Sequence, residues 1–454
     1  MSDAVNQEML DIAAAATKRA LELGATGAEC TISEGEEFSA SVRMREVENL
    51  KQAGSRGAGI RVLIGHLSGS SRTSDLSAQG IDSMVRGALD LARITTPDPH
   101  AGLPDPADLG RFEGPDLKLY DDSVSRIETE WKIAQALKAE EVALAADARI
   151  TNSEGASFDS YLGSRVFANS LGFAGGYRTS SCGLSVVPVA KQNGSMERDY
   201  WHTSAREVSR LESPEAVGKR AAERALRRLN PRKVPTQKVP VIFEPRTARM
   251  LLGDLFDAVN GGAIYRHASF LAGKLGEKIA SESLTVIDDA TMPGLFGSSP
   301  FDDEGVASRR TVVIERGVLK SYLLNTYTAR KLNLKTTGNA SRGLAGAAGV
   351  GPGNFYIEAG TRPEEDLMAG VRQGLYVTEL IGASANTVTG DYSSGAAGLW
   401  IENGELAYPV SEITIAGNMK QILMNLEQVG ANLEFRSSIA SPALLIGEMT
   451  ISGQ

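Results

Sequence analysis

Histidine and cysteine are scarce in this chain of 454 residues. The side chains concerned are His66, His100, His202, His267, Cys30 and Cys182. Zinc sites use imidazole, thiolate and carboxylate ligands, and helical sites commonly pair histidines four residues apart. No two histidines have helical spacing here, and no cysteine follows Cys182. The sequence therefore lacks the local signature of a zinc site, and we expect both cysteines to be buried or half-buried thiols.

Signals for membranes, secretion and nucleic acids are also missing. No apolar run approaches the roughly 20 residues of a spanning helix. Residues 1–8 have neither the basic nor the apolar region of a secretory signal. The net charge of −9 gives no electrostatic reason to expect nucleic-acid or membrane binding. We therefore expect a cytoplasmic protein with reduced thiols.

Two segments come close to known catalytic or nucleotide-binding motifs. Gly382-Ala-Ser-Ala-Asn386 departs at its last position from the G-x-S-x-G elbow of serine hydrolases. The glycine-rich segment 343–353 lacks the Gly-Lys-Ser/Thr ending of a phosphate loop. We predict a flexible surface loop at 343–353. A peptide-binding or interface role stays open, because residues 354–357 are predicted to form an exposed strand.

The length predicts two or three domains. We place an N-terminal α+β module at 1–95, a linker at 96–124, a central α+β module at 125–230 and a β-rich domain at 235–454. The linker is placed here because residues 94–115 contain five prolines and show little apolar periodicity.

Apolar periodicity predicts the elements of the first two modules. Helices are expected over 7–23, 81–93, 125–146 and 214–229, and strands over 28–32, 38–44, 59–64, 69–74 and within 150–200. The last helix carries a set of basic residues, Lys219, Arg220, Arg224, Arg227 and Arg228. We interpret this set as a solvated face near a helix C-terminus, with a patch for an acidic partner as the alternative.

Short strands with glycine turns are typical of the C-terminal half. Strands are expected over 239–243, 284–287, 310–314, 319–324, 398–401 and 413–415. Helices are expected after Pro245 and over 364–377 and 419–429. This pattern predicts a mainly antiparallel, barrel-like or sandwich-like domain with a few helices, and an α+β fold for the whole chain.

Six motifs follow one another in this half. They are Phe301-Asp-Asp-Glu-Gly305, Val312–Tyr322, Thr337-Gly-Asn-Ala-Ser-Arg342, Val388-Thr-Gly-Asp391, Trp400-Ile-Glu-Asn-Gly404 and Pro409–Gly417. In this order they resemble the TldD/PmbA family, also called the modulators of DNA gyrase. Within that family the chain is most similar to the PmbA (TldE) branch. The resemblance is strongest over 235–435 and extends over almost the whole chain.

The resemblance implies a cytosolic TldD/TldE-type protease that cleaves peptides or unfolded polypeptides. In the TldD branch a helix carries the zinc motif His-Glu-x-x-x-His, and a cysteine near the C-terminus completes the ligands. The matching helix positions here are Gly253, Asp254 and Ala258, and residues 435–454 contain no cysteine. The resemblance therefore implies a non-catalytic subunit without metal or cofactor, which completes the substrate channel of a zinc-bearing TldD partner.

The acidic motif Asp302-Asp303-Glu304 occurs in both branches of the family, so the resemblance implies a structural or substrate-channel role for it. Asn339 and Asn354 are assigned to the same channel. Two alternatives remain open. One is a homodimeric peptide-binding or regulatory protein without hydrolysis.

The other alternative is a peptidase with a non-standard metal site. Its ligands would come from Asp254, Asp257, His267 and the 302–304 motif. Asp254 and Asp257 are three residues apart and share a helix face. Oxygen ligands favour hard cations over zinc.

Overall fold

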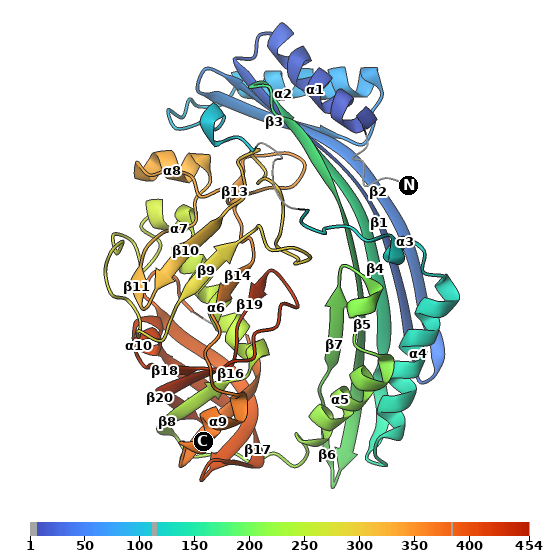
Figure 1. Cartoon of the computed structure of the whole chain (residues 1–454), viewed down its shortest axis with the longest axis vertical. Helices are drawn as coiled ribbons and strands as arrows, with labels where there is room; N and C mark the ends of the chain where they lie inside the picture. Colours follow the sequence, from blue (N-terminus) through green and yellow to red (C-terminus); the bar gives the residue numbers. More distant parts are fainter. Residues whose placement is uncertain (1–6, 111–115, 383–384, 454) are drawn as a thin grey trace.

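One long antiparallel sheet dominates the N-terminal half of the computed structural model, which describes residues 7–110, 116–382 and 385–453. Its main strands are β1 (Gly27–Arg43), β2 (Glu46–Ile64), β3 (Leu67–Thr73), β4 (Ile150–Asn169) and β5 (Ala174–Gln192). They pair in the order β3-β2-β1-β4-β5-β6, with β6 at Ser195–Arg198, and β7 (Trp201–Ala205) pairs with β5. In Figure 1 the long strands curve along one side of the molecule.

Two helical layers cover the ends of this sheet. Helices α1 (Gln7–Glu22) and α2 (Ala78–Arg93) bury apolar side chains against β1 and β2 at one end. Helices α4 (Thr129–Ala145) and α5 (Pro214–Leu226) pack near the other end against β4 and β5. A short helix, α3 (Asp122–Ser125), precedes α4. Burying the apolar stripe of each amphipathic helix is what holds the sheet and helices together.

The C-terminal half contains a closed barrel. Its strands are β8 (Gln237–Phe243), β15 (Gln373–Ile381), β16 (Asp391–Glu402), β17 (Glu405–Asn418) and β20 (Leu444–Ser452). They pair in this order, and the additional pairing of β17 with β20 and of β20 with β8 closes the ring. All these pairs are antiparallel except β8 with β15. The predicted α+β fold with a barrel-like C-terminal half is confirmed.

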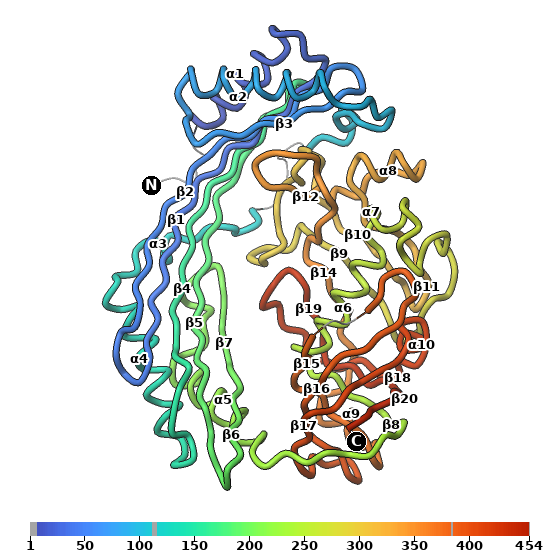
Figure 2. The backbone as a smooth tube through the Cα atoms, turned by 180° about the vertical axis from the view of Figure 1, so that it is seen from behind, coloured from blue at the N-terminus to red at the C-terminus, as the bar shows by residue number. Residues whose placement is uncertain are grey.

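A second, five-stranded sheet lies beside the barrel. It runs in the order β11 (Val318–Leu319), β10 (Arg310–Glu315), β9 (Val286–Asp289), β14 (Phe355–Ile357) and β19 (Ile439–Ala440). Helix α6 (Pro245–Val259) contacts strands of both sheets and buries Leu251, Leu252, Leu255 and Phe256. In Figures 1 and 2 this half faces the long strands, and the chain crosses between the halves near β6 and β8.

Several predicted elements are wrong in extent. The two strands predicted over 28–32 and 38–44 are one strand, β1, which ends at Arg43, because β2 and β4 pair with it along its length. The helix predicted over 364–377 is α9 (Glu364–Ala369), and residues 373–381 form β15. The helix predicted over 419–429 is α10 (Met419–Met424), and residues 426–429 form β18 (Leu426–Val429). Strand pairing in the barrel overrides the local helical pattern in both segments.

The strand predicted to be exposed at residues 354–357 differs from its prediction, whereas residues 343–352 lie at the surface as expected. Phe355 is fully buried in β14, between β9 and β19, so this strand is not exposed. The glycine-rich loop packs closely against β2 at Gly59. A Cβ added at Gly59 would lie only 1.8 Å from the carbonyl oxygen of Leu344. Residues 111–115 of the predicted linker and residues 383–384 of the elbow-like segment lie outside the described residues. No helix in the described part of the chain is long and apolar enough to cross a membrane.

Candidate functional site

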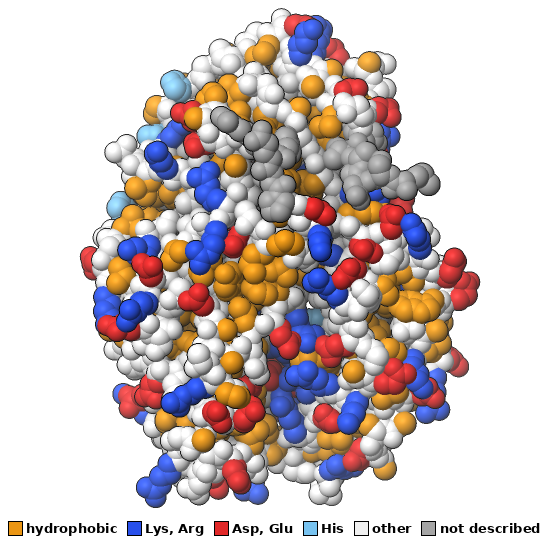
Figure 3. Space-filling view, in the orientation of Figure 1, with side chains coloured by type: hydrophobic (Ala, Val, Ile, Leu, Met, Phe, Trp, Pro, Cys, Tyr) orange, Lys and Arg blue, Asp and Glu red, His pale blue; other side chains and the backbone are white. Residues whose placement is uncertain are grey.

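A cleft separates the long sheet from the C-terminal half. Four adjoining pockets of about 250, 680, 800 and 370 Å³ line it, each with residues from both halves. The first and third pockets share Arg436, and the second and third share Ser204 and Phe296. In Figure 3 basic side chains gather in the hollow between the two halves. Both halves of the described structure therefore build this cleft together.

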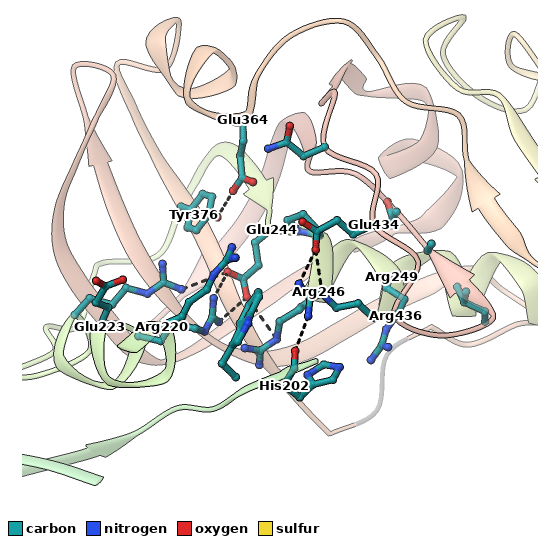
Figure 4. A pocket seen from close by; sticks show the side chains of 18 residues that line it. His202, Arg220, Glu223, Glu244, Arg246, Arg249, Glu364, Tyr376, Glu434 and Arg436 are labelled. Atoms are coloured by element: carbon teal, nitrogen blue, oxygen red, sulfur yellow. Dashed lines mark hydrogen bonds and ion pairs between the residues drawn. The ribbon is translucent and has the colours of Figure 1, made fainter. Parts of the chain in front are cut away.

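The 250 Å³ pocket is rich in arginine, and we call it the arginine pocket. Its charged lining residues are Arg220, Glu223, Arg224, Arg227, Glu244, Arg246, Arg249, Glu364, Glu434 and Arg436. Helix α5 and its C-cap supply the residues from Arg220 to Arg227, and the N-cap and start of α6 supply those from Glu244 to Arg249. Glu364 begins α9, and the segment before β19 supplies Glu434 and Arg436. Trp201 and His202 of β7 complete one wall (Figure 4).

Glu244 organises the floor of this pocket. It is the N-cap residue of α6, but its carboxylate makes no cap hydrogen bond. Instead it accepts hydrogen bonds from Arg224 Nη2 at 2.7 Å, Arg224 Nη1 at 3.0 Å and Arg227 Nη2 at 3.3 Å (Figure 4). Bidentate pairing of this kind fixes the guanidinium plane as well as its position. Glu244 therefore ties α5 of the N-terminal half to α6 of the C-terminal half.

A second buried carboxylate, Asp199, continues the network. Its oxygens lie 3.2 Å from Arg224 Nη2 and 3.4 Å from Arg246 Nη1. Burial opposes ionisation of Asp199, but these two guanidinium groups outweigh it and lower its pKa. The floor thus holds three arginines, Arg224, Arg227 and Arg246, against two carboxylates.

His202 is kept neutral in this setting. Burial, together with Arg436, Arg246 and Arg249, lowers the pKa of its imidazole to about 4. Its Nδ1 atom is buried and has no hydrogen-bond partner in the described structure. His202 lies within β7.

The helix positions that correspond to the zinc motif lie on α6. Gly253 and Asp257 share the less buried face of this helix with Arg246 and Arg249, which line the cleft. A Cβ built at Gly253 meets nothing within 4 Å. Ala258 is fully buried, and its carbonyl oxygen accepts a hydrogen bond from Ser269 Oγ at 2.6 Å.

Asp254 lies on a partly buried side of α6, and burial and the charge of Asp254 together raise the pKa of Tyr392. The described residues contain no group of three or more His, Cys, Asp or Glu side chains placed to hold a metal ion. Asp254, Asp257, His267 and the 302–304 motif are accordingly not brought together as a ligand set.

The acidic motif serves backbone and interface contacts. Asp302 accepts hydrogen bonds from the amides of Glu304, Val306 and Ala340 at 2.9–3.0 Å. Glu304 accepts one from the amide of Thr326 at 2.9 Å, where α8 (Thr326–Leu332) begins. Burial and the charge of Glu304 raise the pKa of Asp302, and burial and the charge of Glu29 raise the pKa of Glu304.

Asp303 lies 2.8 Å from Arg165 of β4, so it contacts the N-terminal sheet. Asn339 Nδ2 donates to Asp288 Oδ2 at 2.7 Å. Asn354 is fully buried and uses its amide to bind Gly297, Asp289 and Ser298. These two asparagines and the three acidic residues do not line the four pockets of the cleft.

The arginine pocket was not predicted as a site. The basic residues of α5 were interpreted as a solvated face, and this is wrong for Arg224, which is 7% exposed. The spacing of Arg220, Arg224 and Arg227 at i, i+4 and i+7 places them on one helix face, and this was the available signal. Their partners Asp199 and Glu244 are distant in sequence and give no local pattern.

The fold defines a two-part α+β protein in which a curved sheet and a barrel domain enclose a cleft. Residues 28–92, 122–229 and 236–453 match domain 1, the central domain and the C-terminal domain of the PmbA/TldA metallopeptidases. The chain belongs to the PmbA/TldD family, and within it to the PmbA/TldE-like metalloprotease members.

Two curated relatives match over nearly their whole length. The chain is 43% identical over 442 residues to Metalloprotease PmbA of Escherichia coli O157:H7, covering 97% of this chain and 96% of the relative. It is 37% identical to the Metalloprotease PmbA homolog of Haemophilus influenzae, covering 99% and 97%.

Solved structures share the fold. A proposed modulator of DNA gyrase from Bacteroides thetaiotaomicron superposes with a TM-score of 0.92 at 30% identity, covering 99% of this chain and 100% of that one. TldE of Thermococcus kodakarensis has a TM-score of 0.87 at 24% identity, covering 96% and 100%, and supports the fold alone.

Proposed function

We propose that this chain is the non-catalytic, PmbA/TldE-like subunit of a cytoplasmic TldD/TldE-type zinc protease. Its partner is a TldD-type subunit that carries the zinc, and the substrates are peptides or unfolded polypeptides. The role of this chain is to bind substrate in its cleft and to complete the channel that leads to the partner's metal.

The observation that carries this proposal is the chemistry of α6. Gly253 and Ala258 have no donor atom, so they cannot ligate zinc. Ala258 is also fully buried, which leaves no room for an imidazole without displacing its neighbours. The residues present therefore do not fit a TldD-type zinc site, and we derive no hydrolytic step for this chain.

The cleft supports a role in holding substrate. It combines polar and apolar walls from both halves, and Arg246 and Arg249 of α6 extend along it toward Gly253, one helical turn further on. A polypeptide bound there would be held by side chains on rigid helices and strands. Such placement positions a substrate without contributing a reacting group.

The experiment that tests this proposal measures metal content and casein cleavage on the same purified protein. We expect less than about 0.1 zinc per chain and no cleavage by this chain alone. Cleavage should appear when a TldD-type subunit from the same genome is added, and it should exceed that of the TldD-type subunit alone. The added activity should be lost on chelation.

Other outcomes select the alternatives. One tightly held metal per chain with chelator-sensitive cleavage by this chain alone would refute the proposal and support a non-standard metal site. A homodimer that binds peptide but neither cleaves nor forms a complex with a TldD-type subunit would also refute it. That result would favour a peptide-binding or regulatory protein.

A further inference from the structure

We propose that the arginine pocket is a binding site for a carboxylate group of a polypeptide ligand. The carboxylate comes either from the C-terminus of a peptide or from an Asp or Glu side chain. Polypeptide as the ligand class rests on the proposed function, whereas the preference for a carboxylate rests on the pocket itself.

Three of the four acidic groups of the pocket are hydrogen-bonded or ion-paired to other residues of its lining. Glu244 is occupied by Arg224 and Arg227. Glu434 lies 2.8 Å from Arg436, and Glu364 accepts a hydrogen bond from the hydroxyl of Tyr376 (Figure 4). The fourth, Glu223, is 63% exposed, and its carboxylate lies 3.9 Å from Nζ of Lys219, a residue that does not line the pocket.

Two arginines of the same lining, Arg220 and Arg249, form no ion pair or hydrogen bond with a carboxylate among the described residues, although the charge of Arg220 acts on the carboxyl of Glu364. Arg220 is held by stacking, with its guanidinium carbon 3.8 Å from the centroid of a Trp201 ring. Arg249 donates one hydrogen bond, to Ser437 Oγ at 3.2 Å. A guanidinium has five N–H donors, so both side chains keep most of their donors for a ligand. Stacking and the single hydrogen bond orient these groups and reduce the entropy lost on binding.

The backbone adds to the positive potential. The pocket includes Glu244, Pro245 and Arg246, which are the N-cap and first turn of the 15-residue helix α6. A helix N-terminus favours an anion, and here the cap carboxylate is diverted to arginines and makes no cap hydrogen bond. Arginines and the helix N-terminus thus point to the same ligand charge.

The walls suit an organic anion better than a free inorganic ion. Trp201, Pro245, Ile439 and Ala440 provide apolar surface beside the arginines. A volume of about 250 Å³ is enough for one or two amino-acid residues and falls below the usual range for larger ligands. A small pocket that combines apolar walls with fixed guanidinium groups suits a peptide C-terminus or an acidic side chain.

Binding of three short peptides to this chain alone, measured by calorimetry at low salt, tests the proposal. The peptides are acetyl-tetraalanine with a free C-terminal carboxylate, its C-terminal amide, and an amide with one internal glutamate. We expect a peptide with a carboxylate to bind at least tenfold more tightly than the uncharged amide. Arg220→Gln and Arg249→Gln should each weaken that binding about tenfold or more, because each removes a charge-assisted contact.

Arg93→Gln is the matched control. It removes the same charge from the surface of α2, where Arg93 is 55% exposed and paired with Asp90. This variant should bind like the unchanged chain. A gain for the free-acid peptide only would identify a C-terminal carboxylate, and an equal gain for the glutamate peptide would identify an acidic side chain.

The proposal is overturned if the uncharged amide binds as well as the acidic peptides. It is also overturned if both arginine variants bind like Arg93→Gln, or if inorganic phosphate binds and none of the peptides does. Because no partner and no cleavage are involved, failure here leaves the subunit proposal standing. A failed cleavage assay with intact carboxylate binding would refute the subunit role alone.

Discussion

Replacing Glu244 with glutamine should destabilise the junction between the two halves. Glu244 is 3% exposed, and the side chain of Arg224 is 8% exposed. The ion pairs of Asp199 and Glu244 balance two negative charges against Arg224, Arg227 and Arg246. Glu244→Gln leaves three guanidinium groups with one carboxylate in a poorly solvated site. Removing one partner of such a buried pair costs about 3–5 kcal/mol.

The size of this effect distinguishes the buried network from a surface ion pair. Glu448 and Lys238 form a pair at 3.1 Å on neighbouring barrel strands, with side-chain exposures of 55% and 66%. Glu448→Gln is therefore the control, and it should cost less than about 1 kcal/mol. Replacing Glu244 by leucine together with Arg224 by methionine should recover much of the loss, since apolar pairs of similar volume replace buried ion pairs well.

Urea unfolding followed by both tryptophan fluorescence and circular dichroism is the appropriate assay. Two probes are needed because a chain with two halves is not expected to unfold in one step. Trp201 lies in the arginine pocket and is 5% exposed, so its environment should change when the junction opens. If Glu244→Gln unfolds within about 1 kcal/mol of the Glu448→Gln control, the reasoning about this network is refuted.

Three further predictions concern the rest of the interface. Arg342→Met removes one of two arginines paired with buried Glu29. Burial opposes ionisation of Glu29, but these arginines lower its pKa, so its stabilisation exists above about pH 4.5 and is lost as pH falls through the lowered pKa. The variant should unfold at higher pH than the unchanged chain in an acid titration; an identical midpoint would contradict this. Gly59→Ala would place a Cβ 1.8 Å from the carbonyl oxygen of Leu344, so it should lower the free energy of unfolding by about 1–3 kcal/mol, as measured by thermal unfolding. Gly54→Ala is the control, because its Cβ would lie 4.0 Å from the nearest atom and should leave the stability unchanged. His202 should stay neutral down to about pH 4 in an NMR titration. Because its folded-state pKa is lowered, its contribution to stability is present above about pH 6.5 and declines as the pH falls toward 4. Arg436→Gln should raise the pKa of His202, and an unchanged pKa would refute the effect assigned to Arg436.

Elements with strong local periodicity were predictable from the sequence. Helices α1, α2 and α5 follow their apolar spacing. Cys30 and Cys182 are buried free thiols, as expected. Burial raises the pKa of both to about 12, which makes thiolate chemistry unfavourable.

Elements that depend on distant pairing were not predictable. Gly35 and its neighbouring glutamates interrupt the apolar alternation of β1, yet β2 and β4 pair with this segment on both sides. Residues 373–377 continue a helical apolar spacing, but Gly370 ends α9 and Leu375 pairs in parallel with Val241 of β8. A single sequence contains the local preference but not the partner strand that overrides it.

The arginines of the cleft and the chemistry of α6 bear on the same question. Arg246 and Arg249 lie on the helix face that also carries Gly253, one to two turns away. Guanidinium groups do not lose their charge at physiological pH, so they repel a divalent cation placed near Gly253 and attract an anionic group. The same potential that would weaken zinc binding on this helix favours a carboxylate in the pocket beside it. Such a potential suits a subunit that holds the polypeptide and leaves the metal to its partner, and the two proposals remain separately testable.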